Sequence, residues 1–280
     1  MIRQFLVVAV FASPLIAALF ANAAWAVTAR EDEDRKRCID RDPTISIPGC
    51  TAVTQSGEET DEMLSIAFNN RGKAYMSNGK YDAALEDFGQ AIKLQGNYAT
   101  AFKNRGIAYE YKGQHDLAMQ DFDQAIHLKP DDADAFNSRG NAYLAQRQYE
   151  QAIKDFDQAI NLKPGYAVAY NSRCWARAIA GQLEQAMVDC NQSLALQPGN
   201  PQTLDSRAFA FLKMGQYAAA VSDYDAALAA NTAIASSLYG RGVAERMRGD
   251  TAKADRDIAS AKKIQADIDQ EFARNGVPGP

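Results

Sequence analysis

The chain has 280 residues, with 35 acidic and 30 basic side chains, and its formal net charge is −5. Nucleic acids and anionic membrane surfaces bind proteins through basic patches, so this acidic balance excludes both as main partners. The chain contains four cysteines, an even number, which is typical of disulfide bonding if the protein is exported.

The N-terminal residues 1–26 have the layout of a secretory signal peptide. One basic residue precedes a largely apolar run over 5–20, and an A-x-A cleavage pattern ends at Ala26. The run is too short for a membrane anchor, and no later stretch of the sequence is apolar enough to span a bilayer. We therefore predict an exported, soluble, periplasmic protein that is cleaved after Ala26, or alternatively after Ala29, and that is not inserted in a membrane.

The segment 27–64 is predicted to be an N-terminal cap or half-repeat. It contains Cys38 and Cys50, which are separated by two prolines. A disulfide between them would fasten a segment that is otherwise poorly ordered. Residues 56–62 are expected to form a loop or the start of a helix.

A repeat of 34 residues organises the rest of the chain. DFGQAIKL begins at Asp87, DFDQAIHL at Asp121, DFDQAINL at Asp155, DCNQSLAL at Asp189 and DYDAALAA at Asp223. Self-similarity at a fixed period is the signature of a repeat architecture. The pattern defines six units, 65–98, 99–132, 133–166, 167–200, 201–234 and 235–268, followed by a C-terminal cap and tail, 269–280.

Each unit is predicted to be a hairpin of two α-helices. The apolar side chains of a unit recur at helical spacing in two runs. Glycine stands at position 15 of five units, where the chain has to turn, and proline at position 32 of three units ends the second helix. Such a hairpin cannot bury its own apolar face and must stack on its neighbours, which predicts an all-α solenoid.

These units resemble the tetratricopeptide repeat family. Its pattern asks for characteristic residues at positions 4, 8, 11, 20, 24, 27 and 32, and the unit 99–132 meets all seven. The last unit departs from the pattern, and Ile268 and Phe272 after it resemble a short capping helix. The resemblance implies a right-handed α-solenoid whose first helices line a concave groove that binds proteins or peptides. The matching residues of unit 99–132 are Phe102, Gly106, Tyr109, Ala118, Phe122, Ala125 and Pro130.

Every unit also carries Arg at position 7 and Asp at position 23. In a hairpin that turns near position 15 these side chains lie almost opposite each other, so structural ion pairs are expected, either within a unit or between neighbours. The alternative is a track that binds anions or sugars. The predicted pairs are Arg71 with Asp87, Arg105 with Asp121, Arg139 with Asp155, Arg173 with Asp189, Arg207 with Asp223, and Arg241 with Asp257.

The resemblance places the partner-binding groove on positions 5 and 9 of the first helices. Amides and lysines fill the N-terminal half of this surface and suit hydrogen bonding to an extended backbone, whereas aromatic residues in the C-terminal half suit an apolar anchor. The alternative is ordinary surface variation, with Trp175 and Phe209 partly buried between units. The candidate groove residues are Asn69, Lys73, Lys103, Asn137, Asn141, Asn171, Trp175, Phe209 and Tyr239.

The cysteines of the fourth unit, Cys174 and Cys190, occupy positions 8 and 24. Other units carry a small residue and an aromatic ring at these positions. Because side chains on a helix lean toward its N-terminus, positions 8 and 24 approach each other, which favours a structural disulfide. Neither cysteine belongs to a C-x-x-C motif or has a histidine beside it in the sequence, so the alternative, a redox protein that uses both thiols, has less support.

The sequence shows no catalytic constellation. Two histidines at unlike positions of one hairpin do not make a repeated metal pair, and no Gly-rich phosphate loop follows a strand. We predict no enzymatic activity, no cofactor and no metal. The expected function is a scaffold that binds a protein or peptide segment, and the alternative is a self-assembling structural protein that forms homo-oligomers.

Overall fold

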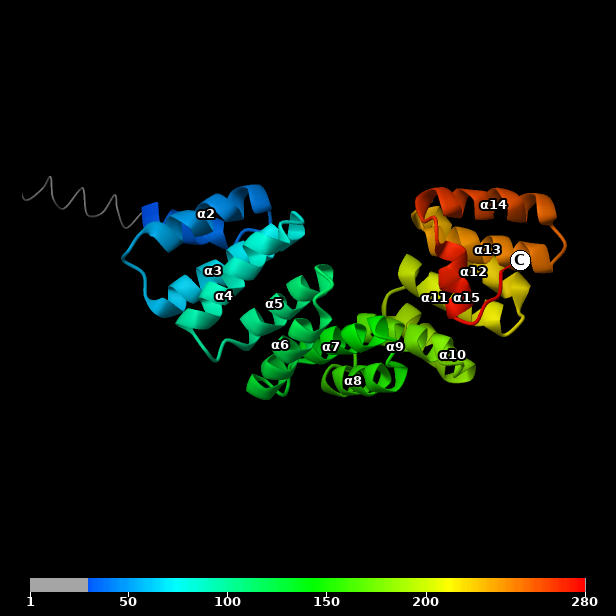
Figure 1. The fold of residues 1–280 in the computed structure, drawn as a ribbon, viewed down its shortest axis with the longest axis horizontal. Helices are drawn as coiled ribbons and strands as arrows, with labels where there is room; N and C mark the ends of the chain where they lie inside the picture. The colour runs from blue at the N-terminus through cyan, green and yellow to red at the C-terminus, as the bar shows by residue number, and fades with distance from the viewer. Residues whose placement is uncertain (1–29, 280) are drawn as a thin grey trace, which may run out of the picture. The chain divides into compact units, whose positions relative to one another are not determined.

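The computed structural model describes residues 30–279, which consist of helices and the loops between them (Figure 1). The predicted signal peptide, residues 1–26, lies outside the described residues. The chain divides into two compact units, which meet in sequence between Gly113 and Gln114. No helix within 30–279 combines the length and apolarity needed to cross a membrane.

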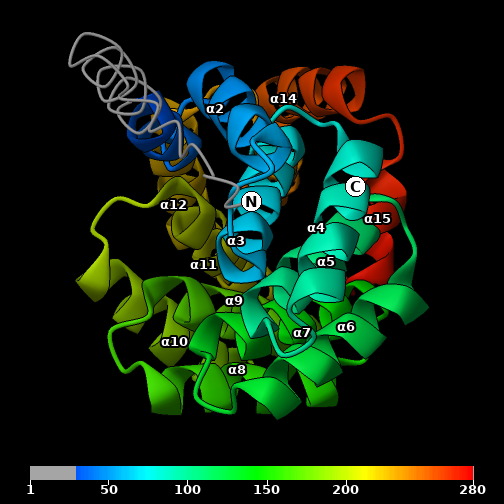
Figure 2. The same cartoon turned by 90° about the vertical axis from the view of Figure 1, so that its left-hand side faces the viewer.

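Unit 1 starts with a helix over residues 30–38 and continues through four longer helices. Side chains cap two of them: Asp42 accepts a hydrogen bond from the backbone of Thr44, and Thr60 accepts one from Met63. Figure 2 shows α2 lying along α3, against which it packs. The helices are α2 (Pro43–Gln55), α3 (Asp61–Ser77), α4 (Tyr81–Leu94) and α5 (Ala99–Tyr111).

Unit 2 begins with the single helix α6 and continues as four antiparallel hairpins followed by one short helix. In this unit α7, α9, α11 and α13 contact one another in succession, and each is also packed against the second helix of its own hairpin. The helices are α6 (His115–Leu128), α7 (Ala133–Ala145), α8 (Tyr149–Leu162), α9 (Ala167–Ile179), α10 (Leu183–Leu196), α11 (Pro201–Lys213), α12 (Tyr217–Ala230), α13 (Ala235–Met247), α14 (Thr251–Ile264) and α15 (Ile268–Arg274).

The turn inside each hairpin requires a left-handed backbone at position 15. Five of the six 34-residue repeats place a glycine there, with φ between 69° and 94°. The repeat 133–166 places Arg147 there instead, with φ 62°. Arg147 is the sole non-glycine residue with a positive φ among those described. The left-handed region costs an ordinary residue about 1 kcal/mol, so something else must favour arginine at this turn.

The two helices of a hairpin approach closely at positions 8 and 24. A Cβ atom built on Gly72 would lie 2.7 Å from the Phe88 ring, and one built on Gly140 would lie 2.7 Å from the Phe156 ring. Both rings are fully buried. The predicted approach of positions 8 and 24 is therefore confirmed in these two hairpins, where the ring leaves no room for a Cβ atom on the glycine.

Candidate functional site

The Arg and Asp ladder pairs residues of the same hairpin. Arg71 donates from Nε and Nη2 to both carboxylate oxygens of Asp87, at 2.8 and 2.7 Å. Arg105 lies in unit 1 and Asp121 in unit 2, and they remain a predicted pair. The same two-pronged contact joins Arg139 to Asp155, Arg173 to Asp189, Arg207 to Asp223 and Arg241 to Asp257.

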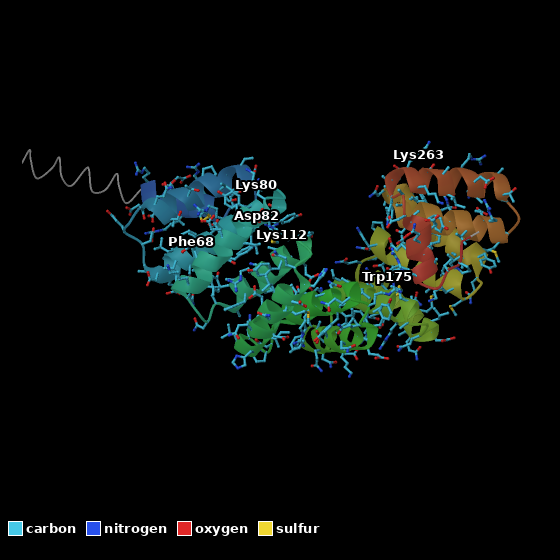
Figure 3. All side chains as sticks on the ribbon, viewed as in Figure 1. Phe68, Lys80, Asp82, Lys112, Trp175 and Lys263 are labelled. Atoms are coloured by element: carbon cyan, nitrogen blue, oxygen red, sulfur yellow. A yellow bond between two sulfur atoms is a disulfide. The ribbon has the colours of Figure 1, made fainter. Side chains whose placement is uncertain are left out.

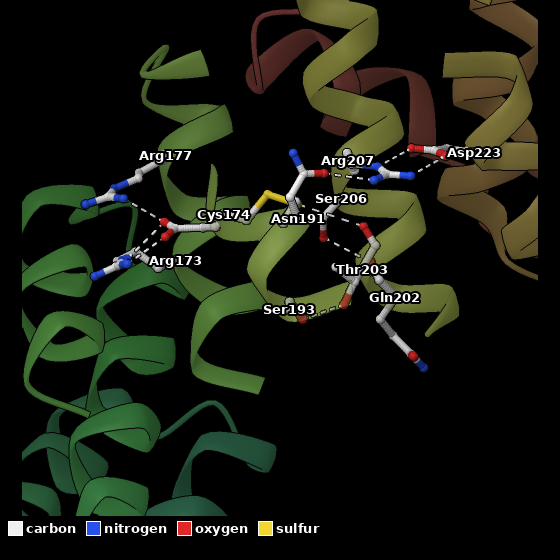
Figure 4. The surroundings of a disulfide bond; sticks show 12 residues. Arg173, Cys174, Arg177, Asn191, Ser193, Gln202, Thr203, Ser206, Arg207 and Asp223 are labelled. Carbon is white, nitrogen blue, oxygen red and sulfur yellow. Dashed lines mark hydrogen bonds and ion pairs between the residues drawn. A yellow bond between two sulfur atoms is a disulfide. The ribbon is translucent and has the colours of Figure 1, made fainter. Parts of the chain in front are cut away.

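The remaining guanidinium nitrogen of each paired arginine reaches back to the preceding second helix. Arg139 Nη1 lies 2.7 Å from Asp123, and Arg207 Nη1 lies 2.8 Å from Asn191, as Figure 4 shows for the latter. Arg71, in the first hairpin, donates to two threonines of α2 instead. Each of these arginines therefore connects the two helices of its own hairpin and also joins them to the helix that precedes the hairpin.

The burial and partners of these contacts favour a structural role over a track for anions. The Asp155 side chain is 7 % exposed, and the hydrogen bonds to it raise the pKa of Arg139. Because each guanidinium nitrogen of Arg139 already donates to a carboxylate, a passing anion or sugar would compete with these partners for the same donors. The arginines also lie over aromatic rings of their own helices, as Arg139 does over Phe136 and Tyr143.

Both cysteine pairs are disulfide bonds. Cys174 and Cys190 join α9 to α10 with their Cα atoms 5.4 Å apart, and both are fully buried (Figure 4). Cys38 and Cys50 join the helix over 30–38 to α2. A closed loop of this length stabilises a fold by about 3 kcal/mol. A redox role needs an accessible sulfur, so this burial favours the structural interpretation.

The candidate groove residues of unit 1 are only partly accessible. Asn69 is buried and accepts a hydrogen bond of 2.9 Å from the Asn104 amide. Lys73 is exposed and Lys103 is partly buried. The amide of Asn69 therefore supports the packing of α3 against α5, and only the lysines present themselves to solvent.

In unit 2 the candidate groove residues divide into three kinds. Asn137 is buried and Asn171 is partly buried, Asn141 is exposed, and Trp175 lies half-buried on α9 (Figure 3). The side-chain oxygens of Asn137 and Asn171 are enclosed and have no hydrogen-bond partner among the described atoms. The exposed Asn141 and the edge of Trp175 are therefore the accessible part of the predicted surface in these two helices.

The aromatic half of the predicted groove is covered by the end of the chain itself. Phe272 of α15 lies 5.6 Å from the Phe209 ring and 4.7 Å from the Tyr239 ring, centroid to centroid. Phe209 in turn lies 4.8 Å from Trp175. Phe209 and Tyr239 are 1 % and 0 % exposed. We expected both to line an open groove, but the C-terminal segment occupies the space above them.

Two basic side chains donate hydrogen bonds to the backbone carbonyl groups at the C-terminal end of α15. Arg147 Nη2 donates to the Arg274 carbonyl at 2.6 Å, and Lys213 Nζ donates to the Asn275 carbonyl at 3.1 Å. Burial lowers the pKa of Lys213. Sequence reasoning missed both residues, although the break in the glycine series at position 15 was a visible signal for Arg147.

A pocket of about 530 Å³ remains beside the segment. Asn141, Leu144, Trp175 and Ile179 line it from α7 and α9, and Glu271 and Arg274 line it from α15. The pocket suits one apolar side chain with polar atoms at the rim. The name first-helix face is used below for the wider surface of unit 2 that is formed by Asn141, Trp175, Phe209 and Tyr239. Within 30–279 no three His, Cys, Asp or Glu residues are placed to hold a metal ion.

Comparison with known proteins identifies the repeats. A family model described as tetratricopeptide repeat matches residues 133–166, and a second model with this description matches 69–133 and 207–261. Together these matches span more than half of the chain. A sequence search of curated proteins finds no match.

Solved structures share the fold at low sequence identity. A tetratricopeptide repeat protein from Parabacteroides merdae superposes with a TM-score of 0.68 at 19 % identity, covering 89 % of this chain and 98 % of that one. PilW, described as a type IV pilus biogenesis factor, gives 0.65 at 23 % identity, covering 71 % and 93 %. Pseudomonas aeruginosa pilF gives 0.63 at 20 % identity, covering 75 % and 96 %.

Proposed function

Because the chain belongs to the tetratricopeptide repeat family, we propose that it is an exported, non-enzymatic scaffold that binds a protein segment on the first-helix face of unit 2. Tetratricopeptide repeats generally bind protein partners, which supports an interaction role. The predicted leader sequence and the two buried disulfides support export, because disulfides form and persist in oxidising compartments.

The pocket beside Trp175 carries this proposal. It offers the flat edge of a tryptophan, two aliphatic side chains and the exposed amide of Asn141 within one hollow. Partly buried aromatic anchors surrounded by polar groups are typical of the small set of residues that supply most binding energy at protein interfaces. Binding would require no cofactor and no covalent chemistry.

The alternative functions have less support from the described residues. The redox interpretation requires reactive thiols, whereas all four cysteines are bonded in pairs and buried. Self-assembly would place a second copy of the chain on an exposed face, and the experiment below separates that outcome by the mass of the product.

Site-specific photo-crosslinking tests the proposal. A photoreactive residue replaces the exposed Asn141 on α7, and the matched control carries it at Val188 on α10, which is 68 % exposed but lies on a second helix. We expect position 141 to capture a protein of defined mass from an extract of the exported fraction and position 188 to capture none. Trp175→Ala should abolish the product, and circular dichroism at the temperature of the experiment checks that the variant, which loses the contact with Phe209, is still folded.

Two outcomes would contradict the proposal. Identical products at both positions would show that the first-helix face has no special role. A product of twice the mass of the chain, made in the absence of extract, would show that the face joins two copies of this protein instead.

A further inference from the structure

The C-terminal segment after α14 has the features of a ligand bound to the first-helix face. Its buried apolar side chains are Ile268, Phe272 and Val277, at 0 %, 2 % and 6 % exposure; Asn275 is buried too, and most of its other residues are exposed. Figure 1 shows α15 lying across the last hairpins of unit 2 instead of extending the stack beyond α14. An amphipathic helix that places apolar anchors in a groove is a common mode of peptide recognition.

The contacts of the segment reach well beyond the last hairpin. Phe272 packs on Phe209 of α11, two hairpins back from the segment, and the Arg274 carbonyl accepts from Arg147 at the turn after α7. The backbone of α15 packs against α13 and α14, as a helix that covers the end of the stack would, but Phe272 and the Arg274 carbonyl extend its contacts to α11 and to Arg147. The segment therefore spans the face on which the family resemblance places a partner.

The backbone after α15 reverses direction, which keeps the end of the segment against the first-helix face. The helix ends at Arg274 and the chain reverses at Gly276, which has φ 85°; the backbone N–H of Val277 then donates to the Phe272 carbonyl, which folds Val277 into the core. A Cβ atom at Gly276 would lie 3.3 Å from Lys213 Nζ. The face supplies cations where the helix C-terminus concentrates its free carbonyl groups and partial negative charge.

Arg147 gives an independent sign that this contact is a specific feature of the chain. Glycine occupies the equivalent position in the five other units, and Arg147 adopts the same left-handed backbone without the freedom of glycine. Its guanidinium lies over the Tyr149 ring and donates to the last helical residue of the segment. The strained residue and the helix that it holds are 127 positions apart in the sequence.

The fit between the segment and the face is incomplete. The Tyr239 hydroxyl is buried under the segment without a hydrogen-bond partner among the described atoms, and the pocket at Trp175 stays unfilled. A buried polar group without a partner weakens a contact. An incoming helix that filled the pocket or accepted from Tyr239 would hold the face more tightly than the resident segment does.

We propose that residues 265–279 are an intramolecular ligand that closes the first-helix face, and that a partner binds by displacing them. The partner would present an amphipathic helix with an aromatic anchor for the seat between Phe209 and Tyr239. Its last carbonyl groups would face Arg147 and Lys213. This inference rests on the proposed function of the same face. It specifies the chemistry of the partner and states that the face is closed in the free protein.

The test uses the full mature chain with a specific protease site inserted between Ala266 and Asp267, in the loop before α15. The chain folds intact and is then cut and dialysed under native conditions. The probe is a fluorescent synthetic peptide of residues 267–280, and the matched control is the same peptide with Phe272→Ala. Circular dichroism of the cut chain reports whether its helices persist.

We expect the cut chain to release its segment, to keep its helical signal and to bind the probe with one-to-one stoichiometry. The uncut chain should bind the probe at least tenfold more weakly, since its own segment competes. The Phe272→Ala peptide should also bind at least tenfold more weakly, because Phe272 is the largest of the buried apolar side chains of the segment.

Substitution of Arg147 separates a positioning role from a purely structural one. Arg147→Gly in the cut chain should weaken probe binding at least fivefold, although glycine suits the backbone and the chain should melt no earlier. Arg147→Lys, which keeps a cationic donor, should retain more of the binding. Glycine that left probe binding unchanged would overturn the assigned role.

Three results would overturn the proposal as a whole. They are a segment that stays bound in the presence of excess probe, a chain that unfolds when the segment leaves, and equal affinity of cut and uncut chains for the probe. Exchange of the probe without crosslinks from position 141 to any extract protein would instead contradict only the proposed function.

Discussion

The pair of Arg139 and Asp155 offers the sharpest test of how the hairpins are held in register. We consider Asp155→Asn, Arg139→Met and the double variant. Methionine keeps an unbranched side chain over the rings of Phe136 and Tyr143, so mainly the charge and its hydrogen bonds are removed. The pair repeats through the stack, so the result applies to the equivalent pairs described above.

The structure sets the size of the effect. Arg139 makes two charge-assisted hydrogen bonds to Asp155, at 2.7 and 2.8 Å, and the carboxylate is 7 % exposed. Removing one partner leaves a buried charge, which costs about 3–5 kcal/mol of unfolding free energy. The double variant leaves no buried charge, so we expect it to cost about 2–3 kcal/mol less than the sum of the two single variants.

Urea unfolding measures these differences, followed by circular dichroism and by the fluorescence of Trp175. The matched control is the pair of Arg246 and Asp255, whose side chains are 33 % and 68 % exposed. Its coupling energy should stay below about 1 kcal/mol because water screens exposed charges. Additivity of the Arg139 and Asp155 variants within about 0.5 kcal/mol would refute the view that the buried pair acts as one element.

Two further predictions concern packing and pH. Gly140→Ala should destabilise the protein by about 1–3 kcal/mol, since the added Cβ would lie 2.7 Å from the buried ring opposite, whereas Gly165→Ala, with open space around it, should cost less than about 1 kcal/mol; equal melting temperatures would contradict the close approach. Burial raises the pKa of Asp205 to about 6 from 3.8, so the folded protein binds this proton more tightly than the unfolded chain and loses stability as the pH rises from about 4 to 6. Relative to the native chain, Asp205→Asn should therefore gain up to about 3 kcal/mol in unfolding free energy between pH 4 and pH 7, measured by urea unfolding at both values, and an unchanged difference would refute the assignment.

Much of the architecture was predictable because it repeats. The 34-residue period, the glycine at the turn and the small residue below a ring each report a contact made inside one hairpin or with the next. The pairing of Cys174 with Cys190 followed from the same reasoning, since both occupy positions at which other hairpins bring side chains together. The ion pairs were predicted as well, but whether they act within or between hairpins was left open; in the structure Arg139, Arg173 and Arg241 form ion pairs both within their hairpin and with the preceding second helix.

The candidate groove was less predictable. Position in the repeat predicted that Trp175, Phe209 and Tyr239 line one groove, and in the structure a chain of ring contacts joins them through Phe272. It did not indicate that the face is covered. A residue at position 9 is exposed or buried according to what else the chain brings to it, and the repeat pattern contains no information on segments that lie outside the repeats.

The sequence by itself determined the hairpins and the family, because these depend on interactions between residues close in the chain and between adjacent units. Only the tertiary structure decided the fate of the groove in unit 2. The contact of Arg147 with the Arg274 carbonyl joins residues 127 positions apart and depends on the accumulated rotation of several stacked hairpins. Small rotations per hairpin add up to that geometry, and no periodic pattern records their sum.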